Sequence, residues 1–203
     1  MTAHYVPQTG QDGQVPLVEF AAPIAAAGVD AAMWQAWLDD PDTLRRFEAL
    51  MYWRGPDRCA YWLGALSSTG HGKFRAGSRA RIQAEAELAV PSRIVTAHVF
   101  AHQVRHDVIT APSAGRAIRH SCDETSCQNW EHLIGGTQPE NIWDYRVRRG
   151  REDGPLADRR GARGRAIAIR HAILTARRSG ADIEEALQQA IAAGIPPHRE
   201  RLF

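Results

Sequence analysis

Two histidines and two cysteines lie within one short stretch of this chain that ends at Asn141, at spacings that suit metal binding. The stretch covers residues 119–141 and reads RHSCDETSCQNWEHLIGGTQPEN. Four residues separate Cys122 from Cys127, and four more separate Cys127 from His132. Thiolate sulfur and imidazole nitrogen are ligands that zinc prefers. We therefore expect these three side chains to hold a structural zinc ion.

A tetrahedral zinc site needs a fourth ligand. Cys59 is the only other cysteine of the chain and is our first candidate, with His71 or His98 as substitutes. The alternative is a disulfide between Cys122 and Cys127, or plain buried thiols. The N-terminal residues show no apolar signal-peptide core, and cysteines of intracellular proteins are metal ligands more often than disulfide partners. The pattern therefore favours zinc.

His120 and Asn141 are left over from the zinc set and could do chemistry of their own. A neutral imidazole can take a proton from water near pH 7. A neutral amide oxygen suits Mg²⁺, which keeps several of its water ligands. With His120 as general base and Asn141 as Mg²⁺ ligand, the pair would suffice for one-metal hydrolysis of a phosphodiester. The simpler interpretation is a structural histidine and an ordinary residue in the first turn of a helix.

Short strands followed by a helix are expected to position these side chains. Residues 116–120 (RAIRH) predict a strand before the metal-binding loop. Residues 137–140 (TQPE) form a capping-box pattern with proline in the first turn. The helix that starts there continues towards Val147 and carries Asn141 in its first turn. His120 and Asn141 would thus lie on opposite arms of a strand–strand–helix unit.

Helical spacing and turn signals organise the rest of the chain. Residues 1–16 read as a loose polar arm. We expect helices over residues 30–38, from Pro41 through Met51, from Thr96 onward, over 165–178 and over 182–193, the last two forming a hairpin of helices. We expect a β-hairpin from strands 58–63 and 73–75, with residues 79–82 as a candidate extension of the sheet.

The positive charge of the chain is almost entirely arginine. The formal net charge is +2, and Lys73 is the only lysine. Eight arginines lie between Arg146 and Arg165, and a guanidinium group can bind phosphate through two parallel hydrogen bonds. This segment is expected to be flexible and to contact phosphates, with a solvated linker as the alternative. A codon bias towards arginine would explain the shortage of lysine but not this clustering.

Together these residues resemble the HNH, or His-Me finger (ββα-metal), nucleases. Within that group the chain is similar to the His-Cys box homing endonucleases and to short HNH proteins of phages and actinobacterial mobile elements. The resemblance covers residues 45–149. It is carried by His120-Ser-Cys122-Asp, Cys127-x-Asn129, Glu131-His132-Leu133, Thr137, Glu140-Asn141 and Asp144, and upstream by Cys59-x-x-Trp62-x-Gly64, Gly70-x-Gly72-Lys73-Phe74 and Ala97-His98.

The resemblance implies an α+β fold with a ββα-metal core, a zinc-stabilised loop and flanking helices at both ends. It implies three parts: an N-terminal arm with helices over 1–54, the nuclease core over 55–149, and an arginine-rich linker with a helical hairpin over 150–203. The chain departs from the family pattern at Val99, Glu124 and Trp130, and it has no cysteines for the second zinc cluster of the His-Cys box enzymes.

The resemblance also implies roles for individual residues. His120 would be the general base and Asn141 the ligand of a catalytic Mg²⁺. The structural zinc would be held by Cys59, Cys122, Cys127 and His132. A basic residue of the hairpin would contact the scissile phosphate, with Arg79 as first candidate and Lys73 and Arg75 behind it. Further candidates for nucleic-acid binding are Arg146, Arg148, Arg149 and Arg151.

The function expected on these grounds is metal-dependent hydrolysis of double-stranded DNA, in a homing-type or phage and mobile-element nuclease. Two alternatives stay open: a zinc-stabilised DNA-binding protein that cleaves nothing, and a defence or toxin nuclease acting on DNA or RNA. No stretch of the sequence approaches the roughly 20 apolar residues of a membrane span. We therefore expect a cytoplasmic protein, nucleoid-associated when bound to DNA, with a homodimer left open.

Overall fold

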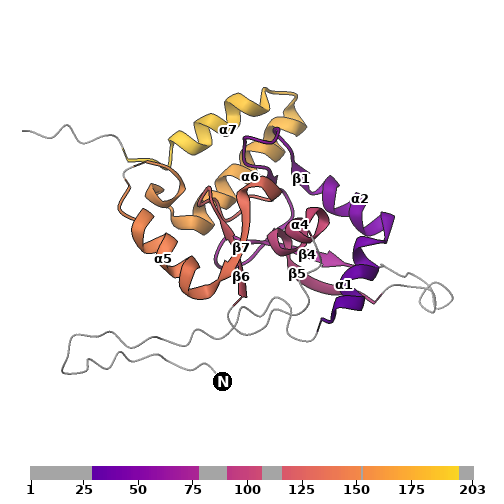
Figure 1. Cartoon of the computed structure of the whole chain (residues 1–203). Coiled ribbons are helices and arrows are strands. Elements are labelled where there is room, and N and C mark those ends of the chain that lie inside the picture. Colours follow the sequence, from indigo (N-terminus) through magenta and orange to yellow (C-terminus); the bar gives the residue numbers. More distant parts are fainter. Residues whose placement is uncertain (1–28, 78–90, 107–115, 152, 197–203) are drawn as a thin grey trace, which may run out of the picture.

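Short antiparallel sheets and helices make up the part of the chain that the computed structural model describes, namely residues 29–77, 91–106, 116–151 and 153–196 (Figure 1). The helices are α1 (Ala31–Leu38), α2 (Pro41–Ala49), α4 (Ala97–Arg105), α5 (Gln138–Arg148), α6 (Gly161–Ser179) and α7 (Ile183–Ala192), with 3-10 turns η1 (Trp130–His132) and η2 (Pro155–Ala157). The expected α+β class is confirmed.

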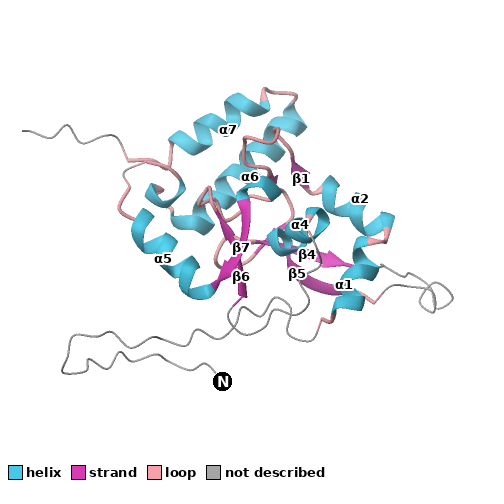
Figure 2. Ribbon diagram, viewed as in Figure 1, coloured by secondary structure: helices cyan, strands magenta, loops and turns pink. Residues whose placement is uncertain are grey.

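Three separate sheets hold the strands of the described residues. The first pairs β1 (Met51–Tyr52) with β2 (Tyr61–Trp62), the second has the order β3 (Ala65–Leu66), β4 (Gly72–Ala76), β5 (Arg93–Thr96), and the third pairs β6 (Arg116–His120) with β7 (Leu133–Thr137). Figure 2 shows α5 beside the β6–β7 hairpin, α1 and α2 on the opposite side of the molecule, and α6 with α7 across the top. The order β6–β7–α5 is the expected strand–strand–helix unit.

Aromatic side chains fill the main core, between the N-terminal helices and the sheets. The Phe47 ring lies 4.8 Å from Phe100, 5.1 Å from Phe74 and 5.3 Å from Trp62, measured between centroids. Both N-terminal helices begin as predicted: the Asp30 side chain accepts a hydrogen bond from a first-turn N–H of α1, and Asp40 does the same for α2. These caps satisfy backbone donors that would otherwise lack partners.

The prediction that strands 58–63 and 73–75 form a hairpin is wrong. Only β2 within residues 58–63 is a regular strand, and it pairs with β1, whereas β4 pairs with β3. Since Met51 pairs with Trp62, the helix predicted to run through Met51 ends at Ala49. Both side chains of β2 are buried, so the alternation that separates the faces of an exposed strand is missing.

The strand–strand–helix unit was expected, but its second strand, β7, was not located in the sequence, and β1, β3 and β5 were not predicted either. β5 directly precedes α4, and Thr96 takes the N-cap position without a side-chain capping bond. β7 contains Gly135 and Gly136, and glycine is a poor strand former. The residues 79–82 suggested as an extension of the sheet lie outside the described part of the chain.

The C-terminal hairpin of helices is confirmed. Gly180 ends α6 in the left-handed conformation (φ +73°), and Asp182 caps α7. Ile169 and Ile173 of α6 and Leu187 of α7 are buried together with Tyr61 and Leu63. The hairpin therefore shares a core with the residues around β2.

The arginine-rich segment 146–165 was expected to be flexible, but helices occupy both of its ends. α5 continues to Arg148 and α6 starts at Gly161. Arg165 is only 4% exposed, and its Nε donates to Glu124 Oε2 at 2.6 Å. Its Nη1 also lies 3.3 Å from a carboxylate oxygen of buried Asp158. This arginine is part of the interior and is not a free phosphate ligand.

Buried Glu124 connects the loop between β6 and η1 (residues 121–129) to the C-terminal hairpin of helices. It is 1% exposed, and its second carboxylate oxygen accepts hydrogen bonds from the Ser126 hydroxyl and backbone N–H. A buried carboxylate is tolerated only when it is paired and hydrogen-bonded. Both conditions are met here only when α6 is docked.

Replacing Arg165 by methionine is expected to lower the free energy of unfolding by about 3–5 kcal/mol, because it leaves the Glu124 carboxylate buried without its cation. Urea denaturation measures this loss. Arg163→Met is the control, since Arg163 is exposed on the same helix. The double variant Glu124→Gln/Arg165→Met should recover part of the loss, and equal midpoints for Arg165→Met and Arg163→Met would contradict the assignment.

None of the helices in the described part of the chain is both long enough and apolar enough to cross a membrane.

Candidate metal centre

The four predicted zinc ligands converge at one point from different parts of the chain. Cys59 precedes β2, Cys122 lies in the turn after β6, Cys127 forms an antiparallel bridge with Tyr61, and His132 ends η1. Their ligand atoms all lie within 4.8 Å of one another. His71 and His98, the substitutes for Cys59, belong to a different cluster.

The spacing of these atoms suits a tetrahedral zinc ion. With Zn–S of about 2.3 Å and Zn–N of about 2.05 Å, tetrahedral angles separate sulfur from nitrogen by about 3.6 Å. His132 Nδ1 lies 3.6 Å from Cys127 Sγ and 3.8 Å from Cys59 Sγ. The three cysteines are free thiols, so the alternative of a Cys122–Cys127 disulfide is wrong for this structure. The cluster could hold a zinc ion.

Hydrogen bonds to the chain before β2 hold the metal-binding loop in place. The buried Asn129 side chain donates to Pro56 O at 2.6 Å and to Arg58 O at 2.7 Å, while its Oδ1 accepts from Glu131 N. Backbone bonds from Trp62 N to Ser126 O and from Gln128 N to Ala60 O join the same two segments. These bonds bring Cys59 to the loop, so Asn129 acts as the organiser of the site.

The three thiols influence one another's ionisation. Hydrogen bonding with Cys127 and Cys59 lowers the pKa of Cys122, whereas hydrogen bonding with Cys122 raises the pKa of Cys59 and of Cys127. Thiols with a raised pKa keep their protons when no metal is bound. Because zinc binds thiolates, loading the site must release protons, and zinc affinity will rise with pH.

His120 is oriented by Cys127, a member of the Cys₃His cluster. Its Nε2 lies 3.1 Å from the backbone oxygen of Cys127. A carbonyl oxygen only accepts hydrogen bonds, so Nε2 carries the proton and Nδ1 keeps its lone pair. Burial, the largest influence, lowers the pKa of His120 below its ordinary value. A neutral ring with a basic nitrogen is the form that a general base needs.

His71 and His98 lie beside His120, which sequence reasoning missed. The ring centroid of His120 is 4.7 Å from that of His98 and 5.8 Å from that of His71. Burial lowers the pKa of His71 to about 4 and that of His98 well below its ordinary value. The sequence feature that could have indicated the position of His71 is the Gly70-x-Gly72 pattern around it. Gly70 adopts φ +88°, and a Cβ on Gly72 would lie 2.7 Å from the Trp62 ring.

Asn141 lies in the first turn of α5, as predicted. The capping box of that helix is complete, with Thr137 and Glu140 bonded reciprocally. Within the described residues, the half-buried Asn141 side chain makes no hydrogen bond. Three residues later Asp144 pairs with Arg119 of β6 at 2.8 Å, which fastens α5 to the strand that ends in His120. The Asn141 oxygen is therefore available to a ligand.

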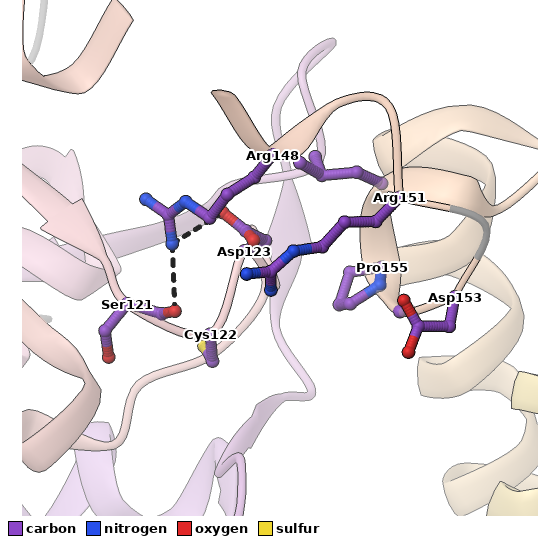
Figure 3. Close-up of a pocket in the computed structure, with 9 residues that line it drawn as sticks. Ser121, Cys122, Asp123, Arg148, Arg151, Asp153 and Pro155 are labelled. Carbon is purple, nitrogen blue, oxygen red and sulfur yellow. Dashed lines mark hydrogen bonds and ion pairs between the residues drawn. The ribbon is translucent and has the colours of Figure 1, made fainter. Parts of the chain in front are cut away.

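The predicted phosphate-binding side chains divide into exposed and paired groups. The exposed ones are Lys73, Arg75, Arg146, Arg149 and Arg151. Arg148 instead donates to Ser121 O at 3.0 Å and pairs with Asp123 (Figure 3). It also pairs with Asp144, one turn earlier on α5. Its contacts link the end of α5 to the turn that carries Cys122. Arg79, the first candidate for the scissile phosphate, lies outside the described residues.

Comparison with known proteins finds no match for this chain, whether among family models, curated proteins or solved structures. The resemblance to the ββα-metal nucleases therefore stays a prediction. Support for a function has to come from the chemistry of the residues themselves.

Cys122→Ser and His132→Asn are each expected to remove tightly bound zinc and the cooperative unfolding transition together. A structural zinc contributes on the order of 10 kcal/mol to folding, against a total stability of roughly 5–15 kcal/mol. Elemental analysis after dialysis against a weak chelator, with thermal unfolding, measures both effects. His171→Asn on the exposed face of α6 is the control. A zinc-free variant with the native fold would refute the structural role.

Proposed function

We propose that this protein is a metal-dependent endonuclease that hydrolyses DNA phosphodiesters, of the ββα-metal type. The observation that carries the proposal is His120. It ends β6, two residues before a zinc-site cysteine, and its Nε2 is bonded to the carbonyl of another. This hydrogen bond sets the direction of the Nδ1 lone pair, which is what positioning of a general base requires.

In the proposed reaction, His120 Nδ1 takes a proton from a water molecule. The water oxygen attacks phosphorus and forms a new P–O bond, while the bond to the 3′ oxygen of the DNA breaks. The leaving oxygen takes a proton from solvent, and His120 releases its own to solvent afterwards. Basic side chains near the phosphate would offset the negative charge that develops.

Asn141 is the proposed ligand of the catalytic divalent cation. Its side chain is half-buried, lies on the helix of the strand–strand–helix unit and makes no hydrogen bond within the described residues. A single neutral oxygen ligand suits Mg²⁺, which takes most of its remaining ligands from water and phosphate. When bound, such an ion would neutralise charge on the phosphate and on the leaving oxygen.

Exposed arginines at the end of α5 are the proposed contacts to the DNA backbone. Arg146 and Arg149 are exposed and form no ion pair within the described residues. Exposed Trp143 and Tyr145 lie on the same helix. A guanidinium that has no carboxylate partner gains more from phosphate than one that must first give up an ion pair.

His120→Ala is expected to lower the rate of plasmid nicking in Mg²⁺ by about 10²–10⁴-fold, the range for removal of a general base, with DNA binding retained. Asn141→Ala should also reduce nicking, and higher Mg²⁺ should partly restore it. Nicked and linear plasmid are quantified on a gel, and binding is measured separately in EDTA.

The control is His171→Ala, an exposed histidine far along the chain on α6. Cleavage by His120→Ala at the wild-type rate would overturn the assignment of the base. Wild-type protein that binds DNA but never nicks it would favour the zinc-stabilised DNA-binding protein. Preferential cleavage of RNA would favour the defence or toxin nuclease.

Arg146→Gln and Arg149→Gln are each expected to flatten the salt dependence of DNA binding, by about 0.9 in the slope of log K against log[salt]. Arg148→Gln should instead destabilise the fold, because Arg148 is held by Asp123 and Asp144. Binding titrations at several salt concentrations and urea denaturation separate the two effects. Unchanged slopes for both exposed arginines would remove this end of α5 from the interface.

A further inference from the structure

Three histidines from three different elements meet beside the zinc cluster without belonging to it. His71 lies between the β3–β4 turn and β4, His98 is in the first turn of α4, and His120 ends β6. One ring nitrogen of each lies within 4.8 Å of the other two. The centroid of His71 is 5.0 Å from that of His98.

Each ring has one nitrogen held by the protein. His71 Nδ1 lies 2.8 Å from the Thr69 hydroxyl, the His98 ring forms a hydrogen bond with the Ile118 backbone, and His120 Nε2 bonds the Cys127 carbonyl. Metal-binding histidines almost always have such a partner on the second nitrogen, because it fixes the tautomer and the ring orientation.

The other ring nitrogen of His98 has no hydrogen-bond partner among the described residues. The residue is 8% exposed, and its Nδ1 is buried with no hydrogen-bond partner. A buried polar atom without a partner costs about 1–3 kcal/mol, so this nitrogen calls for an explanation. A metal ion among the three rings would supply the missing partner.

We propose that His71, His98 and His120 form a second metal site, which takes a first-row transition-metal ion such as Zn²⁺. Three imidazoles suit Zn²⁺ or Co²⁺ and not Mg²⁺, which prefers oxygen ligands. Three histidines leave one tetrahedral position open, and His71 and His120 are only half-buried. At Zn–N of about 2.1 Å the three nitrogens would lie about 3.4 Å apart, so the rings close slightly on binding.

The second site makes zinc an inhibitor of the proposed nuclease. This consequence rests on the proposed function, because the lone pair of His120 Nδ1 that would bind the ion is the one that would accept the proton from water. The two uses exclude each other. Zinc in the Cys₃His cluster would not inhibit, because the ligands of that cluster take no part in the proposed reaction. Zinc would thus stabilise the protein at one site and inhibit it at the other.

The test is a count of bound zinc by elemental analysis and native mass spectrometry at micromolar free zinc. Wild-type protein should bind two ions, whereas His98→Ala and His71→Gln should each bind one. His171→Ala, the matched control on an exposed helix face, should bind two. Thermal unfolding shows whether each variant is folded. If His98→Ala is unfolded, the zinc count of His71→Gln decides, because His71 is only half-buried. One ion in the wild type, or two in both variants, would overturn the site.

Nicking assays then test the inhibitory consequence separately. With zinc at ten times its dissociation constant, about nine-tenths of the sites are filled and the rate should fall about tenfold. The ratio of rates with and without zinc should return towards one in His71→Gln. An unchanged rate in a wild type that holds two ions would refute inhibition and keep the site. If no sample nicks DNA, the proposed function fails and the zinc count alone decides the second site.

Discussion

The meeting of Cys59 with the loop that carries Cys122, Cys127 and His132 is the constraint on which the rest of the site depends. The loop between β6 and η1 has little regular structure, yet Cys127, Gln128 and Asn129 are fully buried. Backbone bonds to Ala60 and Trp62 and the amide of Asn129 bring the two segments together. A metal ion at their junction would replace the hydrophobic contacts that such a short loop cannot make.

Cys127 contributes to both histidine-containing clusters, through different atoms. Its sulfur belongs to the Cys₃His group, and its carbonyl oxygen accepts from His120. Any shift of the loop that changes the sulfur position also turns the imidazole. The orientation of the proposed base is therefore set by the order of the metal loop and not by the strand that carries it.

The spacing of residues along the sequence predicted much of the site, but it did not predict contacts between residues that are far apart in the sequence. The ligands Cys122, Cys127 and His132 and the capping box before Asn141 are local patterns, and the structure brings the three ligands together with Cys59 as expected. The partners of His120 come from a turn and a helix earlier in the chain, and only tertiary packing of Trp62 against Gly72 places His71 there. Likewise, Arg165 resembled its exposed neighbours in a basic segment, because its buried partner Glu124 lies 41 residues away.

That buried pair also bears on how the protein is made. Chains fold from the N-terminus while they are synthesised, and Glu124 emerges from the ribosome well before Arg165. Until α6 follows, the carboxylate has no cation and the hydrophobic side chains around Tyr61 lack their cover. We therefore expect the loop between β6 and η1 to reach its final packing only after α6 has been synthesised. The C-terminal helical hairpin is then part of the centre of this fold and not a separable appendage.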